Sequence, residues 1–259
     1  MAEETVTRAL HDGVALLTLH RPQAKNAFNA AQWDALRTAL DETRENEAVA
    51  AVVVTGAGSA FSAGQDLKEL GGLDGGSGAA FPRFMQALVR FDKPLLAAIN
   101  GVGVGIGATL PLHCDVVYMA ESARLRFPFA SLGLVPEAAS SLLLQLAIGP
   151  RRAAEIFFTA EWIDAQAALE LGLVSRVLPD AELLDATLGR AADIAANPVG
   201  ALRAIKRTLL ASRAPAVQAA LDCEMEGMKA QVGTPEQIEA IQAFFEKRPP
   251  NFRKLRPST

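Results

Sequence analysis

The chain has 259 residues, of which 50% are hydrophobic and 21% are charged, so it can bury a large core and does not have the composition of a disordered protein. Its formal net charge of −4 argues against a general nucleic-acid-binding protein. Its two cysteines, Cys114 and Cys223, show no CxxC spacing, and its three histidines show no metal-ligand spacing. We therefore expect reduced thiols, no metal site and no nucleic-acid partner.

The two ends of the sequence and its apolar runs predict the compartment. The first ten residues are acidic and lack the apolar segment of a secretory signal, and Pro257-Ser258-Thr259 is not a peroxisomal address. No apolar run is long enough to span a membrane. We expect a cytoplasmic protein with no membrane partner.

The first 55 residues predict a hairpin, a helix and a buried strand. Asp12-Gly13 lies between two β-type runs, and this dipeptide favours the tight turn of a hairpin. Asn29 with Gln32 has the spacing of a helix-capping pair, so a helix should follow. The β-branched run 50–55 is typical of a strand that is covered on both faces.

Two glycine-rich turns follow this strand. The first, within 56–70, should lead into a short helix, and 71–78, with five glycines in eight residues, should form a mobile surface loop. A helix over 79–90 and an apolar strand over 95–99 should come next. The second turn, 100–107, should lead into another helix.

The remaining sequence changes from mixed elements to helices. Strands are expected at 115–119, near 125–127 and at 173–178, and only helices from Asp180 to about Lys247. Strands that alternate with helices, followed by helices alone, predict an α/β protein with a parallel sheet and a helical C-terminal part. We divide the chain into a core and a helical region, 1–195 and 196–259.

Glu137 is the candidate catalytic residue. It follows Pro136 and precedes an apolar run of helical length, and proline is favoured in the first turn of a helix. A helix dipole would stabilise a negative charge there, so we expect an anionic carboxylate that can act as a base. From the local sequence alone, a simple role as a helix cap explains Glu137 better.

The two glycine-rich turns could present backbone N–H groups to a ligand, because each follows a buried strand and precedes a helix. Two such groups on one carbonyl oxygen would form an oxyanion hole, and a base beside them would suit proton abstraction next to a thioester. Gly103, Gly105 and Ala108 also match the GxGxxA dinucleotide motif. Its position in mid-chain and the lack of a suitable acidic residue further on argue against a nicotinamide cofactor.

The sequence resembles the crotonase (enoyl-CoA hydratase/isomerase) superfamily over essentially its whole length. The resemblance is carried by four blocks: RPQAKNAFN, VVVTGAGSAFSAGQDL, KPLLAAINGVGVGIGATLPLHCDVVYMAESARLRFPFASLGLVPEAASS and ALELGLVSRVLP. It implies a crotonase-like spiral of ββα turns with a helical C-terminal trimerisation region. It also implies an acyl-CoA thioester substrate, a homotrimer or dimer of trimers, and no cofactor beyond the coenzyme A of the substrate.

The resemblance further implies an oxyanion hole made by the N–H groups of Gln65 and Ile106, with Glu137 as the catalytic carboxylate. Hydratases of the family use two glutamates, and this chain has Thr109 and Phe129 at those positions. One carboxylate suffices to move a proton from C2 to C4, whereas oriented water addition needs two groups to hold the water. The block LGLVPEAASS and the isoleucine in place of a hydratase glycine resemble the peroxisomal-type Δ3,Δ2-enoyl-CoA isomerases.

A larger set of residues is implied to bind coenzyme A or to line the acyl pocket, although surface or core roles explain several of them equally well. The set is Lys25, Ala27, Ser62, Ala63, Asp66, Leu67, Lys68, Gly105, Phe129, Leu134, Phe245 and Lys247. The predicted function is enoyl-CoA isomerisation in fatty acid β-oxidation or related acyl-CoA catabolism. The alternatives are a hydratase-type lyase of the same superfamily and a non-catalytic acyl-CoA-binding scaffold, against which the presence of Glu137 argues.

Overall fold

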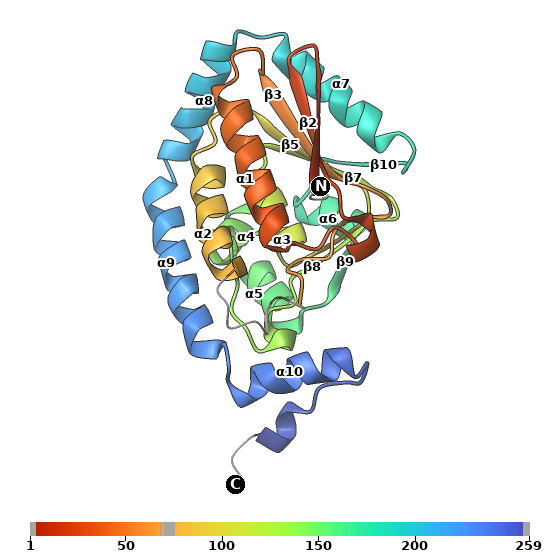
Figure 1. Cartoon of the computed structure of the whole chain (residues 1–259), viewed down its shortest axis with the longest axis vertical. Coiled ribbons are helices and arrows are strands. Elements are labelled where there is room, and N and C mark those ends of the chain that lie inside the picture. The colour runs from red at the N-terminus through yellow and green to blue at the C-terminus, as the bar shows by residue number, and fades with distance from the viewer. Residues whose placement is uncertain (1–3, 68, 70–75, 256–259) are drawn as a thin grey trace.

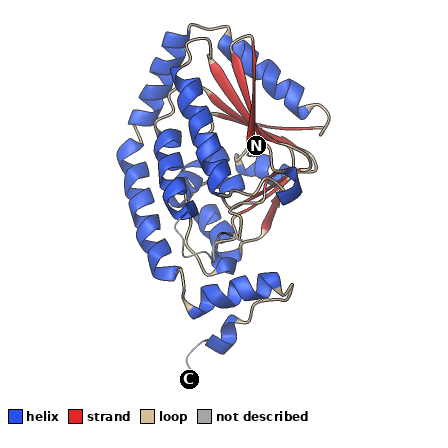
Figure 2. Cartoon of the chain, viewed as in Figure 1, coloured by secondary structure: helices blue, strands red, loops and turns tan. Residues whose placement is uncertain are grey.

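The computed structural model describes residues 4–67, 69 and 76–255, and a six-stranded sheet forms its centre (Figures 1 and 2). In spatial order the strands are β1 (Val6–His11), β2 (Val14–Leu19), β3 (Ala51–Gly56), β5 (Leu95–Ile99), β7 (Val116–Ala120) and β10 (Arg176–Leu178). β1 pairs antiparallel with β2, and the other neighbours pair parallel. The hairpin prediction is confirmed: Asp12 and Gly13 have φ values of 46° and 81°, as its tight turn requires.

A second sheet contains the short strands β4 (Ala60–Ser62), β6 (Val102–Val104), β8 (Arg124–Arg126) and β9 (Trp162–Asp164). β4, β6 and β8 each follow a strand of the large sheet, so the chain places one strand in each sheet before it continues into helices. This is the spiral of ββα turns that the resemblance implied. β4 and β6 occupy segments that the sequence analysis had interpreted only as turns.

The helices begin and end close to the predicted residues in most cases. They are α1 (Ala30–Glu45), α2 (Gly76–Val89), α3 (Ile106–Thr109), α4 (Ser140–Ile148), α5 (Pro150–Thr159), α6 (Ala165–Leu171), α7 (Leu183–Ala195), α8 (Val199–Ala211), α9 (Ala214–Gln231) and α10 (Pro235–Phe245). Four short 3₁₀ turns are η1 (Pro22–Ala24), η2 (Leu110–His113), η3 (Ala130–Leu132) and η4 (Phe252–Leu255). The predicted cap of α1 is confirmed, because the Gln32 N–H donates to Asn29 Oδ1 at 2.9 Å.

Two predictions about the first glycine-rich region were wrong. The short helix expected after the first turn is absent from the described residues 66, 67 and 69, which form turn and loop. Residues 76–78, expected in a surface loop, belong to α2, and 71–75 lie outside the described residues.

The core is formed where α1 and α7 pack on the large sheet and α2 packs against α1. β3 and β5 are buried along their whole length, as predicted for strands that are covered on both faces. Trp33 of α1 packs between Phe28, which precedes α1, and Phe84, which belongs to α2. The centroids of these two rings lie 4.3 and 5.1 Å from that of Trp33. Phe28 is in turn bonded to the first glycine-rich turn: its N–H donates to the Gly64 carbonyl oxygen at 2.7 Å, and its carbonyl oxygen accepts the Asp66 N–H at 2.9 Å.

The C-terminal helices α8 and α9 run along one side of the molecule, and α10 lies across its lower end (Figure 1). α8 is attached to the core by Arg203, whose guanidinium nitrogens lie 2.9 and 3.1 Å from an oxygen of the buried Asp92. α9 packs against α4, which follows the catalytic candidate. Within the described chain, no helix combines the length and the hydrophobicity needed to cross a membrane.

Candidate active site

The two glycine-rich turns lie side by side. A Cβ atom on Gly64 would be 2.8 Å from the carbonyl oxygen of Val104, and a Cβ atom on Gly105 would be 3.9 Å from Gly64 Cα. Gly64 and Gly105 also have positive φ values, 94° and 53°. A side chain at Gly64 would collide with Val104, and at both positions a residue other than glycine would be strained by the positive φ value.

Two backbone N–H groups at these turns are left available. Phe28 forms an isolated parallel bridge with Gln65, and the Gly105 N–H donates to the carbonyl oxygen of Arg126 at 3.1 Å. The N–H groups of Gln65 and Ile106 have no hydrogen-bond partner among the described residues. Ile106 is the first residue of α3, so its N–H has no acceptor within the helix.

Glu137 is the carboxylate beside these turns. Its Oε1 lies 3.7 Å from the position that a Cβ atom on Gly105 would occupy. Glu137 is half-buried in the extended segment between η3 and α4. The fold therefore brings together the base candidate and the two glycines that shape the predicted oxyanion hole.

The predicted environment of Glu137 was wrong in three respects. α4 begins only at Ser140, so the carboxylate precedes the helix and does not lie in its first turn. Nor does Glu137 cap α4 with its side chain, because the amides of Ala139 and Ser141 donate to Glu224 instead. Burial, together with the nearby Glu224 carboxylate, raises the pKa of Glu137 to about 7. Near neutral pH the group is therefore divided between its acid and base forms and is not simply anionic.

The turn that follows Glu137 is held by two residues that the sequence analysis did not select for this site. Ala138 and Ala139 have φ values of 59° and 55°, in the left-handed region that residues with a side chain avoid. His113 contacts the Ala138 carbonyl oxygen through Nε2 at 2.8 Å, and Glu224 accepts the Ala139 N–H at 2.7 Å. His113 lacks metal-ligand spacing to the other histidines, and Glu224 lies 85 positions after Ala139, so no local pattern marks either residue.

Several predicted coenzyme A residues belong to the backbone around the first turn. Lys25 is exposed, and its carbonyl oxygen accepts the Ala63 N–H at 2.9 Å. The Ser62 side chain is fully buried and donates to the Asn26 carbonyl oxygen, so its hydroxyl stabilises the turn. Of these residues, only Lys25 presents a charged group to solvent.

The next predicted coenzyme A residues are Asp66, Leu67 and Lys68, which directly follow Gln65. Asp66 forms an ion pair with Arg21 at 3.2 Å, and Arg21 also donates to the carbonyl oxygen of the buried Ala27. Leu67 is half-buried in the turn beyond. Lys68 lies outside the described residues.

The predicted acyl-pocket and C-terminal residues fall into two groups. Phe129 is buried against Phe157, with ring centroids 6.1 Å apart, and its carbonyl oxygen accepts the N–H of the half-buried Leu134. Phe245 and Lys247 are exposed at the end of α10, which packs mainly on η3 and η4. Their role at the site stays a prediction.

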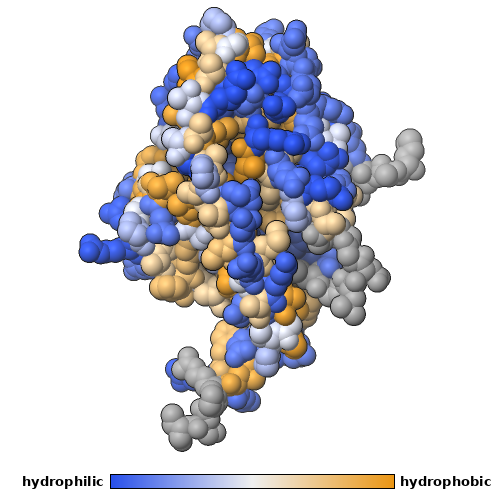
Figure 3. Space-filling view, turned by 90° about the vertical axis from the view of Figure 1, so that its left-hand side faces the viewer, coloured by the Kyte–Doolittle hydropathy of each residue, from blue (hydrophilic) through white to orange (hydrophobic). Residues whose placement is uncertain are grey.

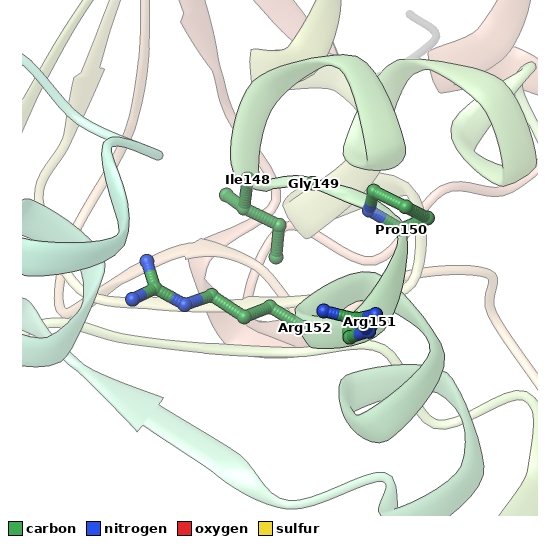
Figure 4. Close-up of a pocket in the computed structure, with 5 residues that line it drawn as sticks. All are labelled: Ile148, Gly149, Pro150, Arg151 and Arg152. Atoms are coloured by element: carbon green, nitrogen blue, oxygen red, sulfur yellow. The ribbon is translucent and has the colours of Figure 1, made fainter.

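A separate cavity of about 340 Å³ lies where α4 meets α5, lined by Ile148, Gly149, Pro150, Arg151 and Arg152 (Figure 4). None of these residues belongs to the predicted site. The described part of the chain contains no group of three or more histidine, cysteine, aspartate or glutamate side chains that could hold a metal ion. Cys114 and Cys223 are both free, as expected from their spacing.

Comparison with known proteins shows the family of the chain. The family model for enoyl-CoA hydratase/isomerase matches residues 9–255. The chain belongs to the enoyl-CoA hydratase/isomerase family. It is 37% identical to a probable enoyl-CoA hydratase of Rhodobacter capsulatus, over 97% of this chain and 99% of the relative. It is 32% identical to the 1,2-epoxyphenylacetyl-CoA isomerase of Escherichia coli, over 96% of this chain and 98% of the relative.

A solved structure shows that the fold is shared with this enoyl-CoA hydratase/isomerase family. The enoyl-CoA hydratase/isomerase of Pseudoalteromonas atlantica T6c superposes with a TM-score of 0.92, at 37% identity, over 96% of this chain and 99% of that one. The protein is therefore an enzyme with the crotonase fold, of the hydratase or isomerase type. Hydratase names predominate among the relatives.

The resemblance implies that hydratase glutamates would stand at Thr109 and Phe129, and both of these residues are buried and uncharged. Thr109 is fully buried in α3, and its Oγ1 has no hydrogen-bond partner among the described residues. Phe129 is also buried. Neither side chain can serve as a carboxylate base, which leaves Glu137 as the candidate.

Proposed function

We propose that the protein is a Δ3,Δ2-enoyl-CoA isomerase that acts on an acyl-CoA thioester. Glu137 takes a proton from C2, which breaks the C2–H bond and gives a dienolate with its charge on the thioester oxygen. The N–H groups of Gln65 and Ile106 stabilise this oxyanion. The protonated Glu137 then delivers a proton to C4, so the double bond moves from C3–C4 to C2–C3 and the carboxylate is regenerated.

One observation supports this proposal most strongly: a carboxylate with a pKa of about 7 lies next to the second glycine-rich turn. A proton shuttle must accept and return a proton at the same pH, and a pKa near the working pH favours both steps. The free N–H groups of the adjacent turns suit the developing oxyanion. Removing one donor of such an oxyanion hole typically costs about 2.7–4 kcal/mol of transition-state stabilisation.

The second candidate is an enoyl-CoA hydratase, which the names of the relatives favour. Water addition needs two groups to orient the water, and the hydratase positions are occupied by Thr109 and Phe129. A non-catalytic acyl-CoA-binding scaffold is disfavoured by the same carboxylate that supports catalysis. The predicted coenzyme A residues around the first turn serve the same thioester substrate in either enzyme.

The wild-type enzyme should therefore convert 3-hexenoyl-CoA to its 2-enoyl isomer and should hydrate crotonyl-CoA poorly. The two reactions can be followed separately, by absorbance for the conjugated thioester and by chromatography for the 3-hydroxy product. Efficient hydration of crotonyl-CoA with no conversion of 3-hexenoyl-CoA would overturn the isomerase proposal and favour the hydratase. Activity on neither substrate would favour the scaffold.

We also infer a homotrimer or dimer of trimers, formed through the helical C-terminal region. Exposed hydrophobic side chains on α8 and α9 support this, namely Ile205, Leu209 and Met225, which are 59%, 58% and 43% exposed. Hydrophobic residues gather beside and below a hydrophilic strip on this side of the molecule (Figure 3). Light scattering should give three or six times the chain mass of 27.3 kDa, whereas a mass of one chain would exclude this assembly.

A further inference from the structure

We propose that Glu224 and His113 are positioning residues, which hold the Glu137 carboxylate in its reactive orientation by clamping the turn that follows it. This inference rests on the proposed role of Glu137 as the proton shuttle. The two residues reach the turn from different elements: Glu224 from the middle of α9 and His113 from η2. Together with the turn itself, the clamp links the C-terminal helical region to the catalytic group.

The turn needs to be held because its backbone is strained. Ala138 and Ala139 are consecutive left-handed residues, a conformation that brings the Cβ atom of alanine too close to the following carbonyl oxygen. Such strain persists only where surrounding contacts impose it, and it concentrates at functional sites. Without those contacts the turn would relax toward an ordinary helical start and would rotate the preceding Glu137.

Glu224 provides the first set of contacts. Its Oε2 accepts the Ala139 N–H at 2.7 Å and its Oε1 accepts the Ser141 N–H at 2.8 Å. Each carboxylate oxygen thus binds one otherwise free amide at the start of α4. The side chain is only 7% exposed, so these bonds form away from competing water.

The shape of α9 is adapted to this contact. Gly227 lies one helical turn beyond Glu224, and a Cβ atom there would come within 3.2 Å of both methyl groups of Val135. The absence of a side chain at Gly227 lets α9 lie against the segment that leads to Glu137. This close approach brings the short glutamate side chain within reach of the amides.

His113 provides the opposing contact. Its Nε2 lies 2.8 Å from the Ala138 carbonyl oxygen, and the ring is 7% exposed. Burial lowers the pKa of His113 to about 4, and the positive charges of Arg213 and Lys206 act in the same direction. The ring is therefore neutral near pH 7, and because a carbonyl oxygen can only accept, Nε2 carries the hydrogen and donates it.

The clamp also has an electrostatic consequence for Glu137. Burial alone would raise the pKa of Glu137, and the Glu224 carboxylate raises it further. Burial raises the pKa of Glu224 itself, and the Ser141 hydroxyl and the amides of Ser141 and Ala139 oppose this shift. If Glu224 were only a structural anchor, a neutral acceptor could replace it without changing the pKa of Glu137. Because the charge of Glu224 also raises that pKa, a neutral replacement should lower it.

The test compares Glu224→Gln with Glu226→Gln, which removes the same charge from an exposed position on the same helix. Glutamine has one acceptor oxygen for two amides, so the turn should loosen. We expect kcat for 3-hexenoyl-CoA to fall about 10- to 100-fold, as for a small displacement of a catalytic group, with little change in KM. The pKa of Glu137 should fall below about 7 in Glu224→Gln and stay unchanged in Glu226→Gln.

The pKa is read without turnover, from the ¹³C-carboxyl resonance of labelled glutamate that disappears in Glu137→Gln. This separates the two proposals: a wild-type enzyme that fails on 3-hexenoyl-CoA would refute the isomerase, whereas the ¹³C titration would still test the clamp. If Glu224→Gln does not fold, the pair His113→Leu and His113→Gln replaces it, since only glutamine keeps a donor for Ala138. An unchanged pKa and kcat in folded Glu224→Gln, or equal kcat in the two His113 variants, would overturn the proposal.

Discussion

The raised pKa of the Glu137 carboxyl affects both the stability of the fold and the transfer of protons. Its pKa is raised from 4.5 to about 7 by burial and by Glu224, so ionising it in the folded protein costs free energy that the unfolded chain does not bear. A carboxyl kept in this condition can act as a base and as an acid near neutral pH. The same raised pKa that suits Glu137 to proton transfer therefore lowers the free energy of unfolding when the carboxyl is ionised.

Replacing Glu137 with glutamine should consequently stabilise the protein at pH 8. Below pH 4.5 the carboxyl is protonated in both states and no difference is expected, and the difference should grow as the pH rises from 4.5 to about 7. A shift of this size corresponds to an advantage of about 1–3 kcal/mol for Glu137→Gln above pH 7. Denaturant unfolding of both proteins at pH 4 and pH 8 measures it, and equal stability at pH 8 would contradict the raised pKa.

At the scale of single residues, the sequence predicted which carboxylate lies at the site but not the contacts and the pKa of that carboxylate. Glu137 and the two donors, Gln65 and Ile106, came from a resemblance in short motifs. The sequence could not predict that the pKa of Glu137 is raised. This shift depends on Glu224, which is distant in sequence, and on how deeply the fold buries the carboxyl of Glu137. His113 was equally inaccessible to sequence reasoning, since a single histidine in an apolar stretch gives no sign of the carbonyl it contacts.

The glycine-rich turns show what one element contributes to the site. Gly105 precedes α3 with φ 53° and ψ −120°, a conformation open to glycine alone, and this places the Ile106 N–H outside the helix. The Gly105 N–H donates to the carbonyl oxygen of Arg126 in β8, so the second sheet holds the turn in place. The oxyanion hole is thus a property of the junction between β6 and α3.

Gly105→Ala tests this junction. A Cβ atom would have ordinary contacts, 3.7 Å from Glu137 Oε1, so the change is disfavoured by backbone strain and not by a collision. We expect a loss of about 1–3 kcal/mol of stability and a decrease in kcat of about 100-fold or more, because the Ile106 donor moves. Gly189→Ala, in α7 with no atom within 4 Å of the new Cβ, is the matched control. An active and stable Gly105→Ala enzyme would show that this donor is unnecessary.

Among whole elements, the longer strands and helices were predicted well, and of the three-residue strands only β8 and β10 were expected. The strands of the large sheet and the helices α1 and α7 follow from alternation, caps and apolar runs. β4, β6 and β9 have only three residues each, too few for a periodic pattern, and they exist because the adjacent strand supplies hydrogen bonds. The late start of α4 follows from the left-handed turn at Ala138 and Ala139, which helix propensity does not anticipate.

At the scale of the molecule, the spiral brings distant segments to one place. Successive ββα turns stack so that residues near 64, 105 and 137 become neighbours, and α9 returns alongside α2 and α4 (Figure 1). The order of strands and helices predicted this architecture, and the family comparison confirms it. The path of α9 could not be predicted, because the amphipathic pattern of a helix does not say which of several apolar surfaces it covers.

The central claim is that one carboxylate, placed by this spiral, carries the proton. The most direct measurement is the rate at which Glu137→Gln converts 3-hexenoyl-CoA at pH 8, compared with the wild-type enzyme and with Glu226→Gln. We expect kcat/KM to fall by about 10²–10⁴-fold in Glu137→Gln only, as for loss of a general base, while the fold is retained. If Glu137→Gln converted 3-hexenoyl-CoA with the kcat/KM of the wild-type enzyme, the claim would be contradicted.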